Sequence, residues 1–245
     1  MAMRHILTFP LGNPKIAKSK GQKVWTSALM LAPATKSGFN VCQTAVELNL
    51  DCLKHCLNLA GQGGIFKKGE TTNTRQTCRI NRTKDLFINK PDTFDRIVAG
   101  INLTIKQALK ADMVPAIRLN CLSDLPWEKM RHPSTGQTLL EMYPDLIFYD
   151  YTKSTKRMID YIAGAMPKNY HLTYSFHEKS DRGLVDWFLN NGGNVAVIFH
   201  RLPEYAGGFQ VINGDLSDAR FLDPKGCIVG LKSKGPAKKS NLVRF

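Results

Sequence analysis

The sequence predicts an α/β protein in which strands of a mainly parallel sheet alternate with helices, an arrangement typical of barrel-like folds of the TIM type. From residue 90 onward, stretches with a helical spacing of apolar residues alternate with short apolar runs. The run at residues 195–200 is almost continuously apolar, as expected for a strand covered on both faces. The sequence leaves open whether the sheet is open or closed into a barrel.

The elements expected after residue 90 follow in order. Pro91 and Asp92 begin a helix, in which the apolar residues 94, 97, 98, 101, 105 and 109 form one stripe. Strands are expected at residues 114–120, 145–151, 170–176 and 195–200, and helices at residues 155–164 and 182–190. Gly192 and Gly193 should end the last of these helices.

A cysteine-bearing helix is expected in the N-terminal part of the chain. Cys52 and Cys56 are four residues apart in a segment with helical spacing, so they should share one helix face, with Cys42 on the turn before it. The length of 245 residues predicts a single α/β domain, residues 1–245. Residues 1–90 would carry the cysteines and a basic loop, and residues 91–245 the strand and helix core.

Three cysteines that meet at one point are a candidate metal site. Cys42, Cys52 and Cys56 could hold a zinc ion with a fourth ligand, for which Cys121 at a strand end is the best candidate. Three thiolates with an open fourth position also hold some iron–sulfur clusters. The spacing matches no standard metal motif. The alternative is that Cys52 and Cys56 are small apolar residues of a buried helix.

The formal net charge of +14 indicates a polyanionic partner, and DNA is the expected one. The alternative is a solvated basic surface that keeps the protein soluble. Six unevenly spaced cysteines, without a secretion signal or an apolar run of membrane length, predict a cytoplasmic location. The candidate phosphate contacts are Lys67, Lys68, Arg79, Arg82, Lys232 and Lys234.

Carboxylates lie at the ends of two expected strands. Asp124 follows the first strand and Asp150 ends the next. Because α/β enzymes place reactive groups at the carboxyl ends of strands, these residues are candidates for a nucleophile and a general base. Asp124 could instead cap a short helix that begins at Leu125.

A third candidate acid is Asp215, which lies close in sequence to Asp218 and Asp223. Three acids in such a short segment could bind a hard cation or supply a base. The alternative is a pair of hairpin turns in which Asp218 and Arg220 form ion pairs.

Several blocks of the sequence resemble a family of tailed-phage proteins. They cover most of the chain and comprise LAPATKSGFNVC with the two cysteines after it, AIRLNCLSDLPWE, LIFYDYTK, NYHLTYS, NVAVIFH and GDLSDARFLDPKGCIVGLKSKGPA. For a phage-encoded protein, the expected compartment is the cytoplasm of the host cell.

The chain is also distantly similar to the barrel-shaped guanine transglycosylases, whose phage relatives insert 7-deazaguanine bases into DNA. This resemblance implies an aspartate nucleophile, a second aspartate as acid or base, and a cysteine-rich zinc site. The SGFN segment resembles their base-binding segment, although it does not stand beside an aspartate as theirs does. The candidate substrate contacts are Ser37, Gly38, Phe39 and Asn40, with Asn120, Tyr151 and Lys153 at the strand ends.

The resulting hypothesis is a DNA-modifying enzyme that exchanges guanine for a 7-deazaguanine base. One carboxylate would attack C1′ of a nucleotide whose base has left the stack, and a second acid would protonate the leaving base. One alternative is a non-catalytic phage DNA-binding protein with a structural metal. Another is an iron–sulfur enzyme with its cluster on Cys42, Cys52 and Cys56.

Overall fold

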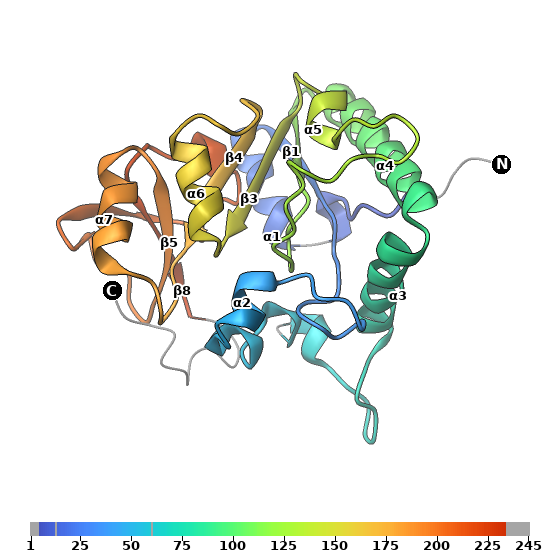
Figure 1. Ribbon diagram of the computed structural model, residues 1–245, viewed down its shortest axis with the longest axis horizontal. Coiled ribbons are helices and arrows are strands. Elements are labelled where there is room, and N and C mark those ends of the chain that lie inside the picture. Colours follow the sequence, from blue (N-terminus) through green and yellow to red (C-terminus); the bar gives the residue numbers. More distant parts are fainter. Residues whose placement is uncertain (1–4, 13, 60, 234–245) are drawn as a thin grey trace.

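The computed structural model describes residues 5–12, 14–59 and 61–233. Within these residues, eight strands form one sheet in the order β1-β2-β3-β4-β5-β8-β7-β6 (Figure 1). The strands are β1 (Val24–Ala28), β2 (Val114–Arg118), β3 (Ile147–Thr152), β4 (Tyr170–Ser175), β5 (Asn194–Phe199), β6 (Tyr205–Ala206), β7 (Phe209–Asn213) and β8 (Ile228–Lys232).

The sheet is open, so the barrel-like arrangement expected from the sequence does not form. Strands β1 to β5 are parallel and adjacent in chain order, as they would be in a barrel. After β5, however, the chain makes the antiparallel hairpin of β6 and β7, and β8 inserts between β5 and β7. The hairpin therefore occupies the far edge of the sheet, where a barrel would need a strand that pairs with β1.

The helices and strands expected after residue 90 are confirmed, with ends that differ by no more than two residues. The helices are α1 (Pro14–Ala17), α2 (Gln43–Glu47), α3 (Thr74–Ile88), α4 (Lys90–Lys110), α5 (Leu139–Met142), α6 (Thr155–Ile162) and α7 (Arg182–Asn190). Gly192 has a φ of 81°, a conformation that favours glycine, and it follows α7 as expected. None of the described helices has both the length and the apolar content needed to cross a bilayer.

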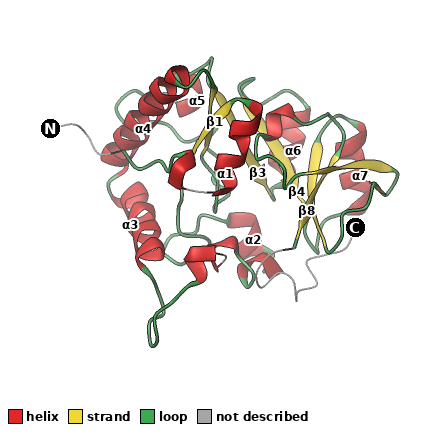
Figure 2. Ribbon diagram, turned by 180° about the vertical axis from the view of Figure 1, so that it is seen from behind, coloured by secondary structure: helices red, strands yellow, loops and turns green. Residues whose placement is uncertain are grey.

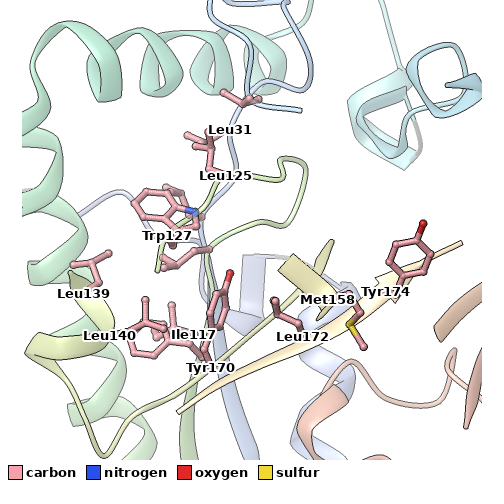
Figure 3. Close-up of a cluster of buried hydrophobic side chains, with 14 of the residues drawn as sticks. Leu31, Ile117, Leu125, Trp127, Leu139, Leu140, Met158, Tyr170, Leu172 and Tyr174 are labelled. Atoms are coloured by element: carbon pink, nitrogen blue, oxygen red, sulfur yellow. The ribbon is translucent and has the colours of Figure 1, made fainter. Parts of the chain in front are cut away.

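The main hydrophobic core lies between the sheet and the connecting helices (Figure 3). Successive parallel strands joined by right-handed crossovers place their helices on one face of the sheet. Accordingly, α4 packs on β1 and β2, α6 on β3 and β4, and α7 on β5. The fully buried Trp127 packs beside Phe94 of α4, with 6.0 Å between the ring centroids. This core fixes the strands whose carboxyl ends carry the polar residues described below.

The prediction of a cysteine-bearing helix is wrong. Helix α2 contains none of the three cysteines, because Cys42 precedes it and Cys52 lies in a separate 3-10 turn, η3 (Asp51–Leu53). Asn49 has a φ of 47°, and a left-handed residue does not continue a right-handed helix. Cys56 follows η3 outside any helix. The three cysteines therefore reach their positions through short turns, and Cys52 and Cys56 do not share a helix face.

Candidate functional site at the carboxyl ends of the strands

The segment that carries the cysteines lies beyond the ends of the strands rather than over either face of the sheet (Figures 1 and 2). Its first part contacts the loop after β2. The backbone amide of Asp124 donates a hydrogen bond of 2.7 Å to the Val41 carbonyl. The Cys42 thiol lies 3.7 Å from the carbonyl oxygen of Leu122. Cys42 is thus held at the carboxyl end of β2.

The second part of the cysteine segment contacts the loop after β4. Glu178 accepts a 2.6 Å hydrogen bond from the backbone amide of Asp51, at the start of η3. Lys179 donates through Nζ to the Leu48 carbonyl over 2.6 Å. These two contacts place Cys52 near the carboxyl end of β4 and bring the segment across the central strands.

Cys42, Cys52 and Cys56, called the cysteine cluster below, lie within electrostatic range of one another. Burial raises the pKa of Cys42 to about 12, and repulsion from Cys56 and Cys52 adds to the effect. Burial also raises the pKa of Cys52, and Cys56 again contributes. The thiols are therefore protonated at neutral pH unless a cation or metal displaces the protons.

Lys153, just after β3, faces the cysteine cluster. Burial raises the pKa of both Cys52 and Cys56, and the positive charge of Lys153 opposes this effect at each thiol. The Lys153 ammonium donates a 2.9 Å hydrogen bond to Ser175 Oγ at the end of β4. The sequence-based expectation placed Lys153 among the substrate contacts, and the structure places it between two strand ends and the thiols.

Arg79 and Lys36 add further positive charge near Cys56, and both lower the pKa of its thiol. Arg79 donates a 2.6 Å hydrogen bond to the side-chain oxygen of Asn58, and the Asn58 amide donates to Cys56 Sγ over 3.4 Å. The guanidinium of Arg79, a candidate phosphate contact in the sequence, therefore binds the cysteine segment.

Among the described residues, no group of three or more His, Cys, Asp or Glu side chains is arranged to hold a metal ion. The thiols instead accept hydrogen bonds from backbone amides, Cys42 from Ala34 over 3.3 Å and Cys56 from Asn58. Metal binding would therefore compete with these hydrogen bonds. Cys121, the expected fourth ligand, packs in a separate apolar cluster with Ile16, Ala28 and Met30.

Asp124 is an ion-pair partner of Arg157. Its carboxylate accepts hydrogen bonds from the Arg157 guanidinium over 2.6 Å, from the Lys153 amide over 2.7 Å and from Thr152 Oγ1 over 3.2 Å. Residues 123–126 form no helix, so Asp124 does not cap one. Both oxygens of this candidate nucleophile already have partners in the structure.

Arg157 on α6 organises this side of the site, and sequence analysis missed it. Its guanidinium binds Glu128 through two hydrogen bonds, of 2.9 and 2.8 Å, and donates to the Tyr170 hydroxyl over 3.0 Å. Only 8% of the Arg157 side chain is exposed. Arg157 stands next to Met158, which belongs to the apolar stripe of α6. A charged residue at such a position indicates that it is buried with an oppositely charged partner.

Asp150 is fully buried at the end of β3. One oxygen accepts a hydrogen bond from the Asn120 amide over 2.7 Å, and the other accepts from the Tyr170 hydroxyl over 3.0 Å. Burial raises the pKa of Asp150 to about 7, against the attraction of Arg118. Through Tyr170 and Arg157, Asp150 and Asp124 belong to one hydrogen-bond network.

The candidate substrate contact Asn120 supports the loop after β2. Its side-chain oxygen accepts hydrogen bonds from Ser123, Leu125 and Trp127, and its amide nitrogen donates to the Leu125 carbonyl. The side chain of Tyr151 lies on the sheet face opposite Asp150, with the Arg118 guanidinium 4.7 Å from its ring centroid. The structure therefore does not bring Asn120, Tyr151 and Lys153 together at one point.

The SGFN residues form a turn before the cysteine segment. Gly38 has a φ of 91°, and Ser37 Oγ accepts from the Phe39 amide over 3.3 Å. Asn40 accepts a 2.9 Å hydrogen bond from the Cys42 amide. Phe39 stacks on Phe87 of α3, with ring centroids 4.6 Å apart. This turn thus joins Cys42 to α3.

The acids near residue 215 do not converge. Asp218 forms an ion pair of 2.9 Å with Arg118 on the face opposite the helices, and each side chain is 3% exposed. Asp223 pairs with Arg220 over 3.3 Å. Asp215, the third candidate catalytic acid, accepts instead from the Lys232 amide at the end of β8. These acids fit ion pairs and turns better than a cation site.

The described candidate phosphate contacts come from the loop before α3, from α3 itself and from the end of β8. Lys67 and Lys68 are exposed in the loop before α3, Arg82 is partly buried on α3, and Lys232 is exposed at the end of β8. Lys234 lies outside the described residues.

The fold and site define an α/β protein with an open parallel sheet and a cysteine cluster at the carboxyl ends of its strands. The family model of gene product 88 (GP88) matches residues 5–244, so the chain belongs to this family. The match agrees with the resemblance to tailed-phage proteins. No curated protein and no solved structure matches the chain. The similarity to guanine transglycosylases stays a prediction.

Proposed function

We propose that this protein is an iron–sulfur enzyme in which Cys42, Cys52 and Cys56 hold the cluster. The observation that carries the proposal is the gathering of three thiols, from one segment after β1, beyond the carboxyl ends of β2 to β4. In open α/β sheets, ligands bind at the carboxyl ends of the strands. Three thiolates on a four-iron cluster leave one iron free for another ligand.

A cluster suits three cysteine ligands better than one zinc ion does. A zinc ion needs four ligands, each about 2.3 Å away when the donor is sulfur, and the side chain of Cys121, the expected fourth ligand, packs in the apolar cluster with Ile16, Ala28 and Met30. In a cluster each iron takes one thiolate, so the thiols can lie farther apart than the ligands of a single ion. The three cysteines then suffice without Cys121.

The surrounding charges fit the same proposal. The negative charge of three thiolates exceeds the positive charge of a zinc ion or of an iron–sulfur core. Positive charge beside the thiols comes from Lys36, Arg79 and Lys153. The bound cluster would supply one-electron chemistry and an iron with an open position. Lys153 lies near Cys52 and Cys56, and its contact with Ser175 holds its ammonium at the end of β4.

A nucleic acid is the proposed substrate class. The net charge of +14 favours a polyanion. The proposal thus keeps the expectation of a DNA-modifying enzyme. It assigns the chemistry to a cluster held by three cysteines instead of to two aspartates.

Base exchange by Asp124 and Asp150 is the second candidate. The pKa of Asp150 near 7 favours it, because a carboxyl group that is protonated near neutral pH can donate a proton to a leaving base. The hydrogen bonds already made by both residues weigh against it. Nucleoside mass spectrometry of phage DNA, with and without the gene, would reveal 7-deazaguanine if this candidate is right.

The test of the iron–sulfur proposal is elemental analysis of protein prepared without oxygen and reconstituted with ferrous iron and sulfide. Equal amounts of iron and acid-labile sulfide, with a brown colour, are the expected result. Zinc bound in preference to iron would support a structural metal instead. Protein that binds neither metal would overturn the proposal.

A further inference from the structure

A hollow is lined in part by the end of β5. Strand β5 pairs with β4, and the loop after β4 contacts the cysteine segment. The hollow has a volume of about 510 Å³, which falls within the range of small-ligand sites. It is lined by residues of α7, of the end of β5 and of the β6–β7 hairpin, among them Arg182, Asp186, Phe199, Arg201 and Tyr205. None of these residues belongs to the cysteine cluster or to the network around Arg157.

The polar lining of this hollow favours an anion. Arg182 and Arg201 provide two guanidinium groups, against the single carboxylate of Asp186. The Arg182 guanidinium lies 4.8 Å from the ring centroid of Phe176, which restricts its orientation at the rim. Guanidinium groups bind phosphate through paired hydrogen bonds. A phosphate group is therefore the anion that this part of the hollow suits best.

The hollow also offers an aromatic surface. Tyr205, in the two-residue strand β6, is 60% exposed, whereas Phe199, which also lines the hollow, is 8% exposed. An exposed aromatic ring beside arginines is the arrangement on which single-stranded nucleic acids stack their bases. Free phosphate would make no use of the ring.

We propose that this hollow binds one nucleotide of a single-stranded nucleic acid, with the phosphate on Arg182 and Arg201 and the base on Tyr205. The net charge of +14 favours a strand over a free nucleotide. Strand β5 pairs with β4, and the cysteine cluster lies beyond the carboxyl ends of β2 to β4. A nucleic acid bound in the hollow would therefore extend along the carboxyl ends of these β-strands toward the cysteine cluster. The proposal does not depend on the cluster.

The experiment measures fluorescence anisotropy of a labelled oligothymidylate of about 12 nucleotides, a length within the site sizes of single-strand binding folds. Arg201→Ala and Tyr205→Ala should each weaken binding by about tenfold. Tyr205→Phe keeps the ring and should bind within about twofold of the unchanged protein. Arg131→Ala removes an equal charge from an exposed arginine that pairs with Glu141 outside the hollow, and it serves as the control.

Two outcomes would overturn the proposal. In one, Arg201→Ala binds no more weakly than Arg131→Ala, so that only net charge matters. In the other, Tyr205→Ala binds as well as Tyr205→Phe, so that the ring makes no contact.

Competition with thymidine monophosphate tests whether the ligand is a nucleic-acid strand or a free nucleotide. Binding of the monophosphate as tight as that of the oligonucleotide would show a free nucleotide as the ligand and overturn the assignment of a strand. Circular dichroism melting verifies that each variant is folded.

Discussion

Arg157 of α6 and Asp124 of the loop after β2 form an ion pair of 2.6 Å, with 8% and 12% of their side chains exposed. The pair joins two segments that are far apart in the sequence. Since the amide of Asp124 also donates to the Val41 carbonyl, the same residue helps to hold the cysteine segment at the sheet. Asp124 thus has a structural role that explains its position without catalysis.

Asp124→Asn should lower the free energy of unfolding by about 2 kcal/mol, because it weakens charge-assisted hydrogen bonds of a largely buried carboxylate, while Glu128 still pairs with Arg157. Denaturant unfolding measures the loss. The matched control is Asp160→Asn on α6, which breaks an i,i+4 pair whose Lys156 side chain is 74% exposed. That control should cost less than about 0.5 kcal/mol. Equal losses in the two variants would show that the Arg157 pair contributes no more than a surface contact.

Asp150→Asn should change how stability depends on pH. The folded-state pKa of Asp150, about 7, lies above the ordinary aspartate value of 3.8 because the carboxyl group is buried. The folded protein therefore binds more protons than the unfolded chain between these two pH values, and this carboxyl group makes stability fall as pH rises through that window. The Asn variant lacks this contribution. Unfolding measured at pH 5 and pH 8 should show a smaller decline in the variant than in the unchanged protein, and an identical decline would contradict the raised pKa.

Lys153→Met should slow the alkylation of Cys52 severalfold at a fixed pH near 8. The Lys153 charge lowers the pKa of this thiol, so its removal leaves less thiolate to react. Rates of iodoacetamide labelling, followed by mass spectrometry of the peptide, measure the effect. Lys156→Met removes the same charge from an exposed position on α6 and should leave the rate unchanged. If the two variants react alike, Lys153 does not face the cluster.

The sequence predicted the second half of the fold well because its periodic signals are local. The stripe of α4 and the continuous apolar run of β5 each reflect burial that neighbouring residues share. The barrel-like arrangement was wrong because sheet closure depends on where β8 pairs, and no local pattern encodes its insertion between β5 and β7. The cysteine helix failed at Asn49, whose left-handed backbone interrupts a spacing that suggested one helix.

The candidate site was predicted in part for a similar reason. The three cysteines are close in sequence, so their gathering could be expected, as could the position of Lys153 after a strand. The partners of Asp124 and Asp150 come from α6 and β4, and the sequence does not indicate which residues pair over these distances. Carboxylates that seemed available for catalysis are therefore engaged in the folded protein.

The most direct test of the iron–sulfur proposal compares iron and sulfide content in three proteins reconstituted without oxygen: the unchanged chain, Cys56→Ala and Cys78→Ala. Cys78 is an exposed cysteine on α3 outside the cysteine cluster, so it controls for the loss of any thiol. We predict equal iron and sulfide in the unchanged chain and in Cys78→Ala, and almost none in Cys56→Ala, with similar melting temperatures before reconstitution. Cys56→Ala that retains as much iron as Cys78→Ala, or an unchanged chain that binds no iron, would contradict the account.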